Sequence, residues 1–341
     1  MRLKLALELL GLVVLAVLIA VMPHLIGNFT AYEFAIVGMY FITLLGLAVL
    51  TGYSGQISLG HGAFMAIGGY TTAILSVDGI YGHDLRSVWT IPIAGVVAGL
   101  AGLLVGVPAL RLSGLYLALI TFGIAVSFPQ LPKKFDHFFG GTTGKVIDDA
   151  LTVPFGLDTT TNNWLYYLTW GIAFVLLVAA WLLLRGKTGR ALQAIRDSEI
   201  AASSSGVNLA TYKTLAFGIS AFYAGVAGAL YVIARAYMNP DVFPIILSVY
   251  LVAALAVGGL NSFVGLIAGA ALIYVLQNRA DDVTTWINHL PWFDLDAKRP
   301  GMPSVIFGAV LILVMLALPT GAGGLLRRVF GPLTTRLYSR S

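Results

Sequence analysis

The sequence contains no cysteine, and only 10% of its 341 residues are charged. The missing thiols exclude disulfides, thiolate metal ligands and cysteine nucleophiles. A soluble protein carries about 25% charged residues. The low charge, together with 58% hydrophobic residues, excludes an ordinary soluble protein and leaves no room for a large soluble domain. We therefore predict an all-α, polytopic membrane bundle.

Apolar runs near the length of a bilayer crossing recur along the whole chain, and a crossing needs about 20 residues. The first run follows Arg2 and Lys4 as in a signal peptide, but no small-x-small cleavage site follows it, so we expect an uncleaved span. Glycines at 258 and 259 divide the run 245–277 into a helical hairpin or two half-helices. We predict one transmembrane domain over 1–341 with about ten spans, near 5–22, 31–50, 58–77, 89–108, 114–131, 164–184, 214–234, 243–258, 261–278 and 302–319.

None of these spans has an acidic residue at its centre. Ion-coupled carriers and pumps usually place ionisable residues within the membrane, so the energy source is expected outside this chain. It is not an internal nucleotide site, because Trp181 stands where the phosphate loop ending in Gly186-Lys187-Thr188 needs glycine. HExxH and GxSxG motifs are also absent. We predict no catalytic residue, no metal site and no cofactor in this chain.

Basic residues are divided unequally between the two sides that ten spans define. One side holds 12 of the 20 basic residues and three of the 15 acidic residues. Basic residues predominate on the cytoplasmic side of membrane proteins. Both termini and the loop 185–213 are therefore predicted to be cytoplasmic, and the loops 132–163 and 279–301 external.

Small residues recur at the spacing of closely packed membrane helices. This pattern favours a tightly packed bundle, although many membrane bundles show it whatever their function. The pairs and triplets are Gly95/Gly99, Gly102/Gly106, Ala221/Gly225/Ala229 and Gly265/Gly269.

The segment 51–62 places hydroxyls, an amide and an imidazole among four glycines at membrane depth. Unwound backbone is tolerated there where protein or a water-filled cavity satisfies it, and broken helices form transport sites in other membrane proteins. One hypothesis is that the segment lines a solute pathway. The alternative, favoured for His61 alone, is that its polar groups only bond neighbouring helices. The candidate pathway residues are Tyr53, Ser54, Gln56, Ser58 and His61.

The loop 185–213 is too polar for lipid, and residues 190–205 contain neither proline nor an interior glycine. A helix there would carry a narrow stripe of small, mildly apolar residues, suited to docking in the groove of another protein. Gly206 would end the helix as a C′ glycine. The alternative is an ordinary solvated loop helix. The stripe comprises Ala191, Ile195, Ser198 and Ala202, flanked by Arg196, Asp197 and Glu199.

Four stretches carry a resemblance to a known family. They are GYSGQISLGHGAFMAIGGYTTAIL at 52–75 and the segments 111–125, 189–231 and 239–272. Together they resemble the permease subunits of ATP-binding-cassette (ABC) importers of the branched-chain amino acid (LivM-like) class. In that class the region resembling 189–212 holds the coupling helix that docks on the ATPase, which implies this role for the loop predicted above.

The resemblance also implies partners and a place in the cell. It implies a second related permease, two cytoplasmic ATPases that bind ATP and Mg²⁺, an external substrate-binding protein, and the prokaryotic inner membrane. Nucleic acid is not expected as a partner. Two departures are Asn261 in the GGxGS-like turn and Lys145 after the external glycines. The second leaves the solute open, because related permeases serve urea, amides or aromatic acids.

Two other classes of protein remain as alternatives. A self-sufficient secondary transporter would need an intramembrane ionisable residue to couple an ion. An integral membrane enzyme would have only His61 and external aspartates to work with, at no metal-ligand spacing.

Overall fold

The protein is described here from a computed structural model. It describes residues 2–25, 27–79, 87–110, 112, 114–148, 151, 160–260 and 262–279, and eight isolated positions between 305 and 324. The predicted span 302–319 and the external loop 279–301 lie almost entirely outside the described residues.

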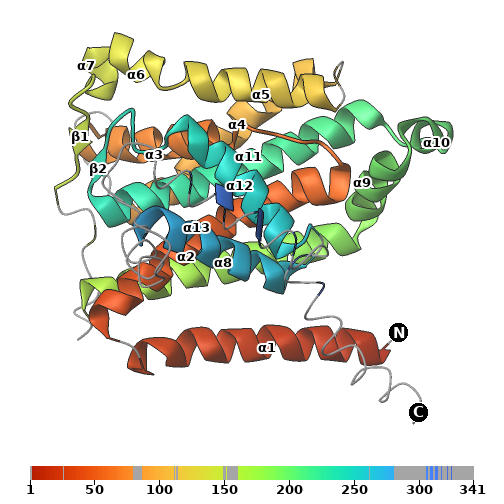
Figure 1. The fold of residues 1–341 in the computed structure, drawn as a ribbon, viewed down its shortest axis with the longest axis horizontal. Coiled ribbons are helices and arrows are strands. Elements are labelled where there is room, and N and C mark those ends of the chain that lie inside the picture. Colours follow the sequence, from red (N-terminus) through yellow and green to blue (C-terminus); the bar gives the residue numbers. More distant parts are fainter. Residues whose placement is uncertain are drawn as a thin grey trace, which may run out of the picture.

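The described chain is an all-α, polytopic membrane protein (Figure 1). Within the described residues, five helical segments are long and apolar enough to cross a membrane. Shorter apolar helical stretches are Val13–Leu25, Ile245–Gly258 and Phe263–Asn278. The helices are α1 (Arg2–Leu25), α2 (Asn28–Leu47) continued by a π-helix (Ala48–Tyr53), α3 (His61–Val77), α4 (Ser87–Ala109), α5 (Leu115–Ser127), α6 (Gln130–Lys134), α7 (Asp136–Phe139), α8 (Thr161–Arg185), α9 (Lys187–Asp197), α10 (Glu199–Ser204), α11 (Leu209–Arg235), α12 (Ile245–Gly258) and α13 (Phe263–Asn278).

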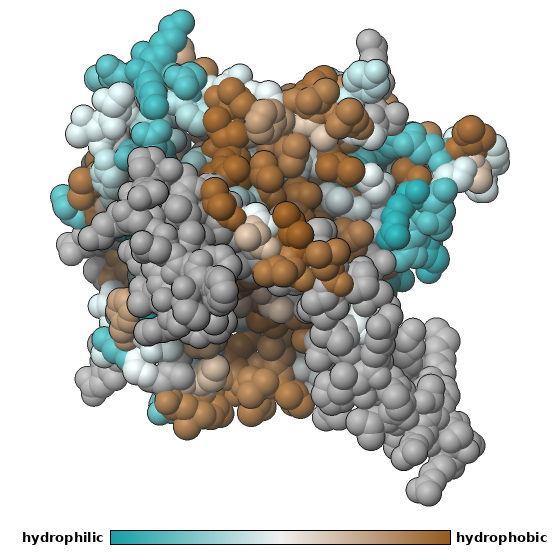
Figure 2. Space-filling model, viewed as in Figure 1, coloured by the Kyte–Doolittle hydropathy of each residue, from teal (hydrophilic) through white to brown (hydrophobic). Residues whose placement is uncertain are grey.

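The first nine predicted spans each coincide with a helix, with shifted ends. The span predicted from residue 58 begins only at His61, because the preceding residues are unwound. Figure 2 shows hydrophilic residues gathered at two opposite ends of the visible face, over α6–α7 and over α9–α10, with a hydrophobic region between them. This distribution fits a bilayer that surrounds the middle of the bundle.

Helix α11 lies at the centre of the bundle and packs against α2, α3 and α4. The backbones of α11 and α3 are in direct contact. A Cβ atom on Gly68 would lie 2.1 Å from the Gly225 carbonyl oxygen, and one on Gly228 would lie 1.9 Å from the Met65 carbonyl oxygen. Lipid supplies no hydrophobic force between helices, so such close approach supplies the packing energy.

The small-residue pairs predicted from spacing lie at helix contacts. Gly95, Gly99, Gly102 and Gly106 of α4 all face α11, and a Cβ atom on Gly102 would meet the Ala221 Cβ at 2.4 Å. The pair on α13 faces α12 in the same way. The expectation of a tightly packed bundle is confirmed at these contacts.

Helices α12 and α13 form the predicted hairpin. Gly258 lies against the Gly265 carbonyl and Gly269 against the Ala254 carbonyl, so the two helices are antiparallel. Gly259, with φ 96° and ψ 120°, makes a turn that an L side chain would strain. At about 1.5 Å per residue the helices are about 21 Å and 24 Å long, shorter than the ~30 Å hydrocarbon core.

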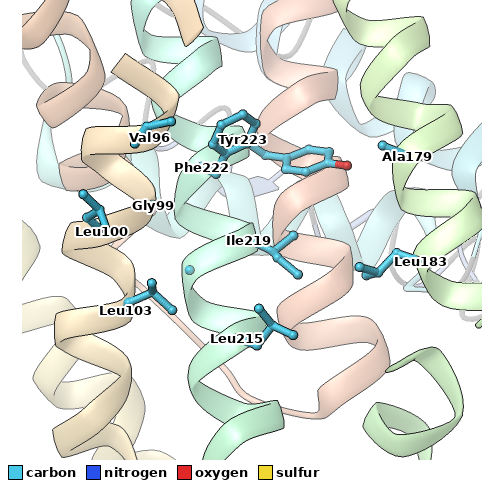
Figure 3. A pocket seen from close by; sticks show the side chains of 11 residues that line it. Val96, Gly99, Leu100, Leu103, Ala179, Leu183, Leu215, Ile219, Phe222 and Tyr223 are labelled. Atoms are coloured by element: carbon cyan, nitrogen blue, oxygen red, sulfur yellow. The ribbon is translucent and has the colours of Figure 1, made fainter. Parts of the chain in front are cut away.

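A groove of about 380 Å³ lies between α4 and α8, with α11 as its floor (Figure 3). Its lining is almost wholly apolar, and the Tyr223 hydroxyl is already bonded to the Leu176 carbonyl at 2.8 Å. A solute that carries ammonium and carboxylate groups would find no polar partner there. The groove is lined by Val96, Gly99, Leu100, Leu103, Ala179, Leu183, Leu215, Gly218, Ile219, Phe222 and Tyr223.

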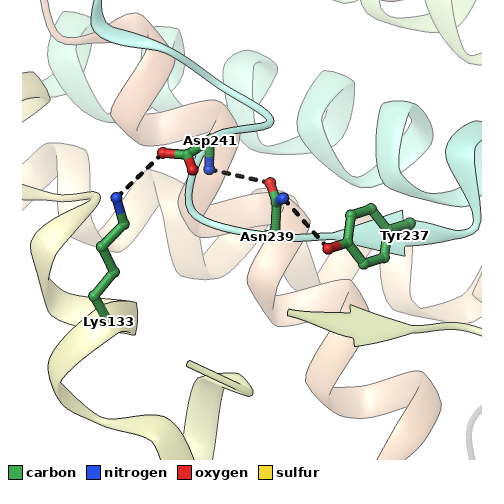
Figure 4. Close-up of polar contacts among 4 residues, drawn as sticks. All are labelled: Lys133, Tyr237, Asn239 and Asp241. Atoms are coloured by element: carbon green, nitrogen blue, oxygen red, sulfur yellow. Dashed lines mark hydrogen bonds and ion pairs between the residues drawn. The ribbon is translucent and has the colours of Figure 1, made fainter. Parts of the chain in front are cut away.

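Ion pairs join the connecting segments at the end of the bundle opposite α9 and α10. Lys133 of α6 pairs with Asp241 at 3.3 Å, and the Asn239 side chain accepts from the Asp241 amide and donates to the Tyr237 hydroxyl (Figure 4). Lys145 pairs with Asp78. Strands β1 (Lys145–Val146) and β2 (Tyr237–Met238) add a short antiparallel ladder there.

The α3–α11 contact yields a stability prediction. Gly228→Leu is expected to lower the thermal unfolding temperature of the detergent-purified chain, because its Cβ would overlap the Met65 backbone and overpacking costs about 1–3 kcal/mol. Gly171→Leu is the matched control, since a Cβ on Gly171 meets nothing within 4 Å. Equal unfolding temperatures for the two variants would contradict the packing described here.

Candidate functional site

The loop 185–213 forms two helices, not the single helix predicted over 190–205. Helix α9 ends at Asp197, Ser198 is extended with φ −163° and ψ 114°, and α10 begins at Glu199. The Ser198 hydroxyl accepts a hydrogen bond from the Ala201 amide at 3.2 Å. The continuous helix was wrong because a serine at this position caps a new helix in preference to continuing the old one.

Gly206 ends α10 as predicted. It has φ +83°. The Val207 amide donates to the Ala202 carbonyl and the Gly206 amide to the Ser203 carbonyl. This is the Schellman arrangement, in which a C′ glycine in the left-handed region lets the chain satisfy the last helical carbonyls.

The apolar stripe faces its own bundle. Ala191, Ile195 and Ala202 are 8%, 2% and 2% exposed, while Ser198 at the helix junction is exposed. The prediction that this stripe docks in a groove of another protein is therefore wrong for the three buried members. The stripe packs the loop against its own membrane helices, and the fully buried Leu192 belongs to the same face.

The outward surface of α10 carries one large apolar side chain, Ile200, which is 80% exposed. It lies at the end of the molecule where Figure 2 shows a largely hydrophilic surface. Asp197, the last residue of α9, is also exposed. Sequence reasoning missed Ile200 because it placed both helices on one helical wheel, and the break at Ser198 changes which side chains of α10 face outward.

Two of the charges expected to orient a partner bind within the chain instead. The Arg196 guanidinium donates to the Gly52 carbonyl, with 2.5 Å between Nη1 and O. Glu199 pairs with Lys213 of α11 at 2.6 Å, and the Lys213 side chain is only 6% exposed. The loop is thus bound to the end of one membrane helix and the start of another.

The predicted polar segment is an interruption between α2 and α3. The π-helix ends at Tyr53, residues 55–60 are unwound, and α3 starts at His61. Burial alternates along it. Ser54, Gln56 and Ser58 are at most 5% exposed, whereas Ile57 is 41% exposed. Of the five candidate pathway residues, Tyr53 is the one that is not buried inside the chain.

The buried polar groups of the segment bond mainly within the segment and to α5. The Ser54 hydroxyl donates to the Leu50 carbonyl at 2.6 Å and accepts from the side-chain amide of Gln56 at 2.8 Å. The Leu59 amide donates to the Thr121 hydroxyl of α5 at 2.9 Å. The bonds to the Leu50 carbonyl and from the Leu59 amide supply internal partners of the kind that interrupted backbone needs at membrane depth.

His61 contacts a neighbouring helix. Its Nε2 lies 2.6 Å from the Ser220 hydroxyl of α11, and the adjacent Gly62 amide donates to Ser248 of α12 at 3.0 Å. The start of α3 is therefore joined to two other helices. This contact matches the interpretation in which His61 bonds its neighbours.

No group of three or more His, Asp or Glu side chains within the described part of the chain is arranged to hold a metal ion.

Comparison with known proteins gives the family. Residues 29–315 match the permease component of the branched-chain amino acid transport system. The chain belongs to this permease family. It is 32% identical over 334 residues to the high-affinity branched-chain amino acid transport system permease protein LivM of Escherichia coli K12, an alignment that covers 91% of this chain and 73% of that protein. LivM of Salmonella typhimurium LT2 is 30% identical over the same shares. No solved structure matches the chain.

The membership confirms the resemblance stated from the motifs. The protein is a permease subunit of the ABC importer class, a non-catalytic transport component of a membrane. The roles of the two regions described above, the α9–α10 loop and the segment before α3, remain predictions.

The alternating burial changes how the pathway hypothesis is tested. Ser58→Trp is expected to lower the unfolding temperature, because Ser58 is fully buried and a ring there has no space. Ile57→Trp, on the accessible edge of the same segment, is expected to leave the fold intact and reduce solute uptake severalfold. Unfolding scans and uptake assays measure the two effects. Wild-type uptake by a folded Ile57→Trp variant would count against this edge as part of the pathway.

Proposed function

We propose that this permease is one half of the transmembrane pathway of an importer for branched-chain amino acids or a related small polar solute. The other half would be a second, related permease. Two cytoplasmic ATPases would bind ATP and Mg²⁺, and an external binding protein would deliver the solute. Closing of the ATPase dimer would switch the pathway between outward-open and inward-open states. The names of the two LivM relatives support the solute class.

Permeases for urea, amides or aromatic acids remain the alternative within the family. The departure that raised it, Lys145, has a structural role here. The Lys145 ammonium pairs with Asp78, and its side chain is only 10% exposed, so it is not a free charge available to a solute. The pairing removes Lys145 as a ground for preferring one of these other solutes.

The observation that carries the proposal is the α9–α10 loop. It is short and packed on its own bundle through buried apolar residues, and it presents Ile200 outward. An exposed apolar side chain on a short helix, within a charged surface, is suited to insertion into a groove of a partner. We propose that α10, with Ile200 and Asp197, is the coupling contact with an ATPase.

We further propose that the α9–α10 end faces the cytoplasm of a prokaryotic cell, with both termini on that side of its inner membrane. The basic residues Arg185, Lys187 and Arg190 lie at this end, as the positive-inside bias requires. In this naturally cysteine-free chain, a single cysteine at Ser203 should react with an impermeant reagent only from inside, and one at Asp148 only from outside. Reaction of Ser203→Cys with the impermeant reagent in intact cells would show that the proposed orientation is wrong.

Reconstitution with the second permease, the ATPases and the binding protein tests the function. ATP-dependent uptake of leucine, isoleucine or valine is expected. Ile200→Glu should abolish retention of the ATPase and uptake together, because a carboxylate buried without a partner costs several kcal/mol.

Val146→Glu is the matched control, since Val146 is 61% exposed at the opposite end. Ala202→Glu is unsuitable, because Ala202 is buried in its own chain. Uptake by this chain alone without ATP would support the secondary transporter, and full ATPase retention by Ile200→Glu would refute the coupling contact.

A further inference from the structure

Arg196 joins the cytoplasmic loop to the interruption in the membrane helix. It lies in the last turn of α9, and its guanidinium donates to the carbonyl of Gly52, which belongs to the π-helix at the end of α2. The α2 and π-helix residues together form a span from Asn28 to Tyr53, across the whole bundle. The contact therefore connects the loop to one of the most deeply buried spans, at the point where that span unwinds.

The contact forms because the π-helix at the end of α2 leaves backbone carbonyls that need hydrogen-bond donors. The last four carbonyls of a helix lack intrahelical partners, and the helix dipole makes this end negative. The backbone amide of Gln56 donates to the Leu50 carbonyl at 3.2 Å. The Gly52 carbonyl accepts a hydrogen bond from the Arg196 guanidinium. Charge-assisted hydrogen bonds of this kind are stronger than those between neutral groups. Arg196 also lies at the C-terminal end of α9, where a cation is favoured for the same reason.

The aliphatic part of the Arg196 side chain also packs against the unwound segment, at Gly55. Gly55, with φ +74°, lies so near that a Cβ atom on it would be 3.2 Å from Arg196 Cγ and 3.5 Å from Arg196 Cβ. Leu192 and Ile195 hold the rest of α9 against the bundle. The adjoining helix α10 is held separately, through Glu199 and Lys213 of α11. Arg196 thus supplies a polar contact between the loop and the helix interruption that is independent of the α10–α11 ion pair.

We infer that Arg196 is a positioning residue that makes α9 and the unwound segment 54–60 move as one body. A displacement of the loop would then shift the segment in front of α3, together with its contacts to α5. The inference rests on the proposed function, in which the loop receives the motion of the ATPase. It adds the residue through which that motion reaches the membrane.

The first test is Arg196→Ala in the reconstituted importer. The ATPases should stay bound and hydrolyse ATP, while the amount of solute moved per ATP falls at least tenfold. Arg196→Lys, which keeps the charge without the planar fork, should recover part of this ratio. Arg190→Ala is the control, because it removes the same charge from α9 and leaves the bond between Arg196 and Gly52 in place. It should leave the ratio unchanged. A wild-type ratio for Arg196→Ala overturns the inference.

The second test replaces the polar contact with a covalent one. The 3.5 Å between the Cβ positions of residues 55 and 196 lies at the edge of the disulfide range of about 3.5–4.5 Å, and the chain has no other cysteine. In Gly55→Cys/Arg196→Cys, oxidation should form the bond, seen as lost maleimide labelling, and restore uptake. Reduction should return uptake to the level of Arg196→Ala. Gly55→Cys alone measures the effect of a side chain at positive φ.

The outcomes separate the two proposals. Blocked uptake in the oxidised double variant would mean that the contact must open during transport, and it would overturn the inference of one moving body. If Gly55→Cys prevents folding, the ratio measured for Arg196→Ala decides alone. Failure of the wild-type complex to bind ATPases or to transport with ATP would instead refute the proposed function.

Discussion

The close approach of α11 to α3 and α4 is the contact on which the rest of the structure depends. Water drives apolar side chains together in soluble proteins, but lipid does not. Here the helices approach until the Gly68 and Gly228 positions touch backbone carbonyls of the facing helix. With α11 fixed at the centre, the ends of α2 and α3 and the start of α11 are brought to defined positions, and both candidate functional regions are built from those ends.

Ser54, Gln56, Ser58 and His61 are buried polar residues that lie where one helix stops and the next begins. The interruption between α2 and α3 leaves backbone groups without helical partners. The Ser54 hydroxyl bonds the Leu50 carbonyl, and the Thr121 hydroxyl accepts from the Leu59 amide. The same physical need explains Arg196 at the Gly52 carbonyl and Ser198 at the start of α10. A broken helix in a membrane therefore requires specific neighbours, and these neighbours come from the helices and the loop that the permease is proposed to move.

The loop has two faces with separate roles. Its inner face, with Leu192 and Ile195, is part of the bundle. Its outer face exposes Ile200 and Asp197, which are the proposed contact with an ATPase. A rigid element with one face bound to the membrane helices is better suited to transmit a displacement than a loop free to deform, because closely packed interiors transmit strain. This arrangement is consistent with a subunit whose energy source lies outside its own chain.

The sequence by itself determined the membrane class, nine of the helices, the helix-packing glycines, the α12–α13 hairpin and the glycine that ends α10. Each depends on a local or composition-level property: hydrophobic length, the missing Cβ, or the left-handed backbone that glycine allows. The motifs also identified the permease family. The tertiary structure decided which way the polar and small residues face.

Periodicity showed that Ala191, Ile195 and Ala202 share a stripe, but an apolar stripe does not state whether its own bundle or another protein covers it. In the same way, the cluster of polar residues from Tyr53 to His61 signalled an interruption, but only the packing of α5 and α11 around it decided that Ser58 and His61 point inward. Side-chain direction at a helix end depends on where the next helix lies, and that is a property of the folded bundle as a whole.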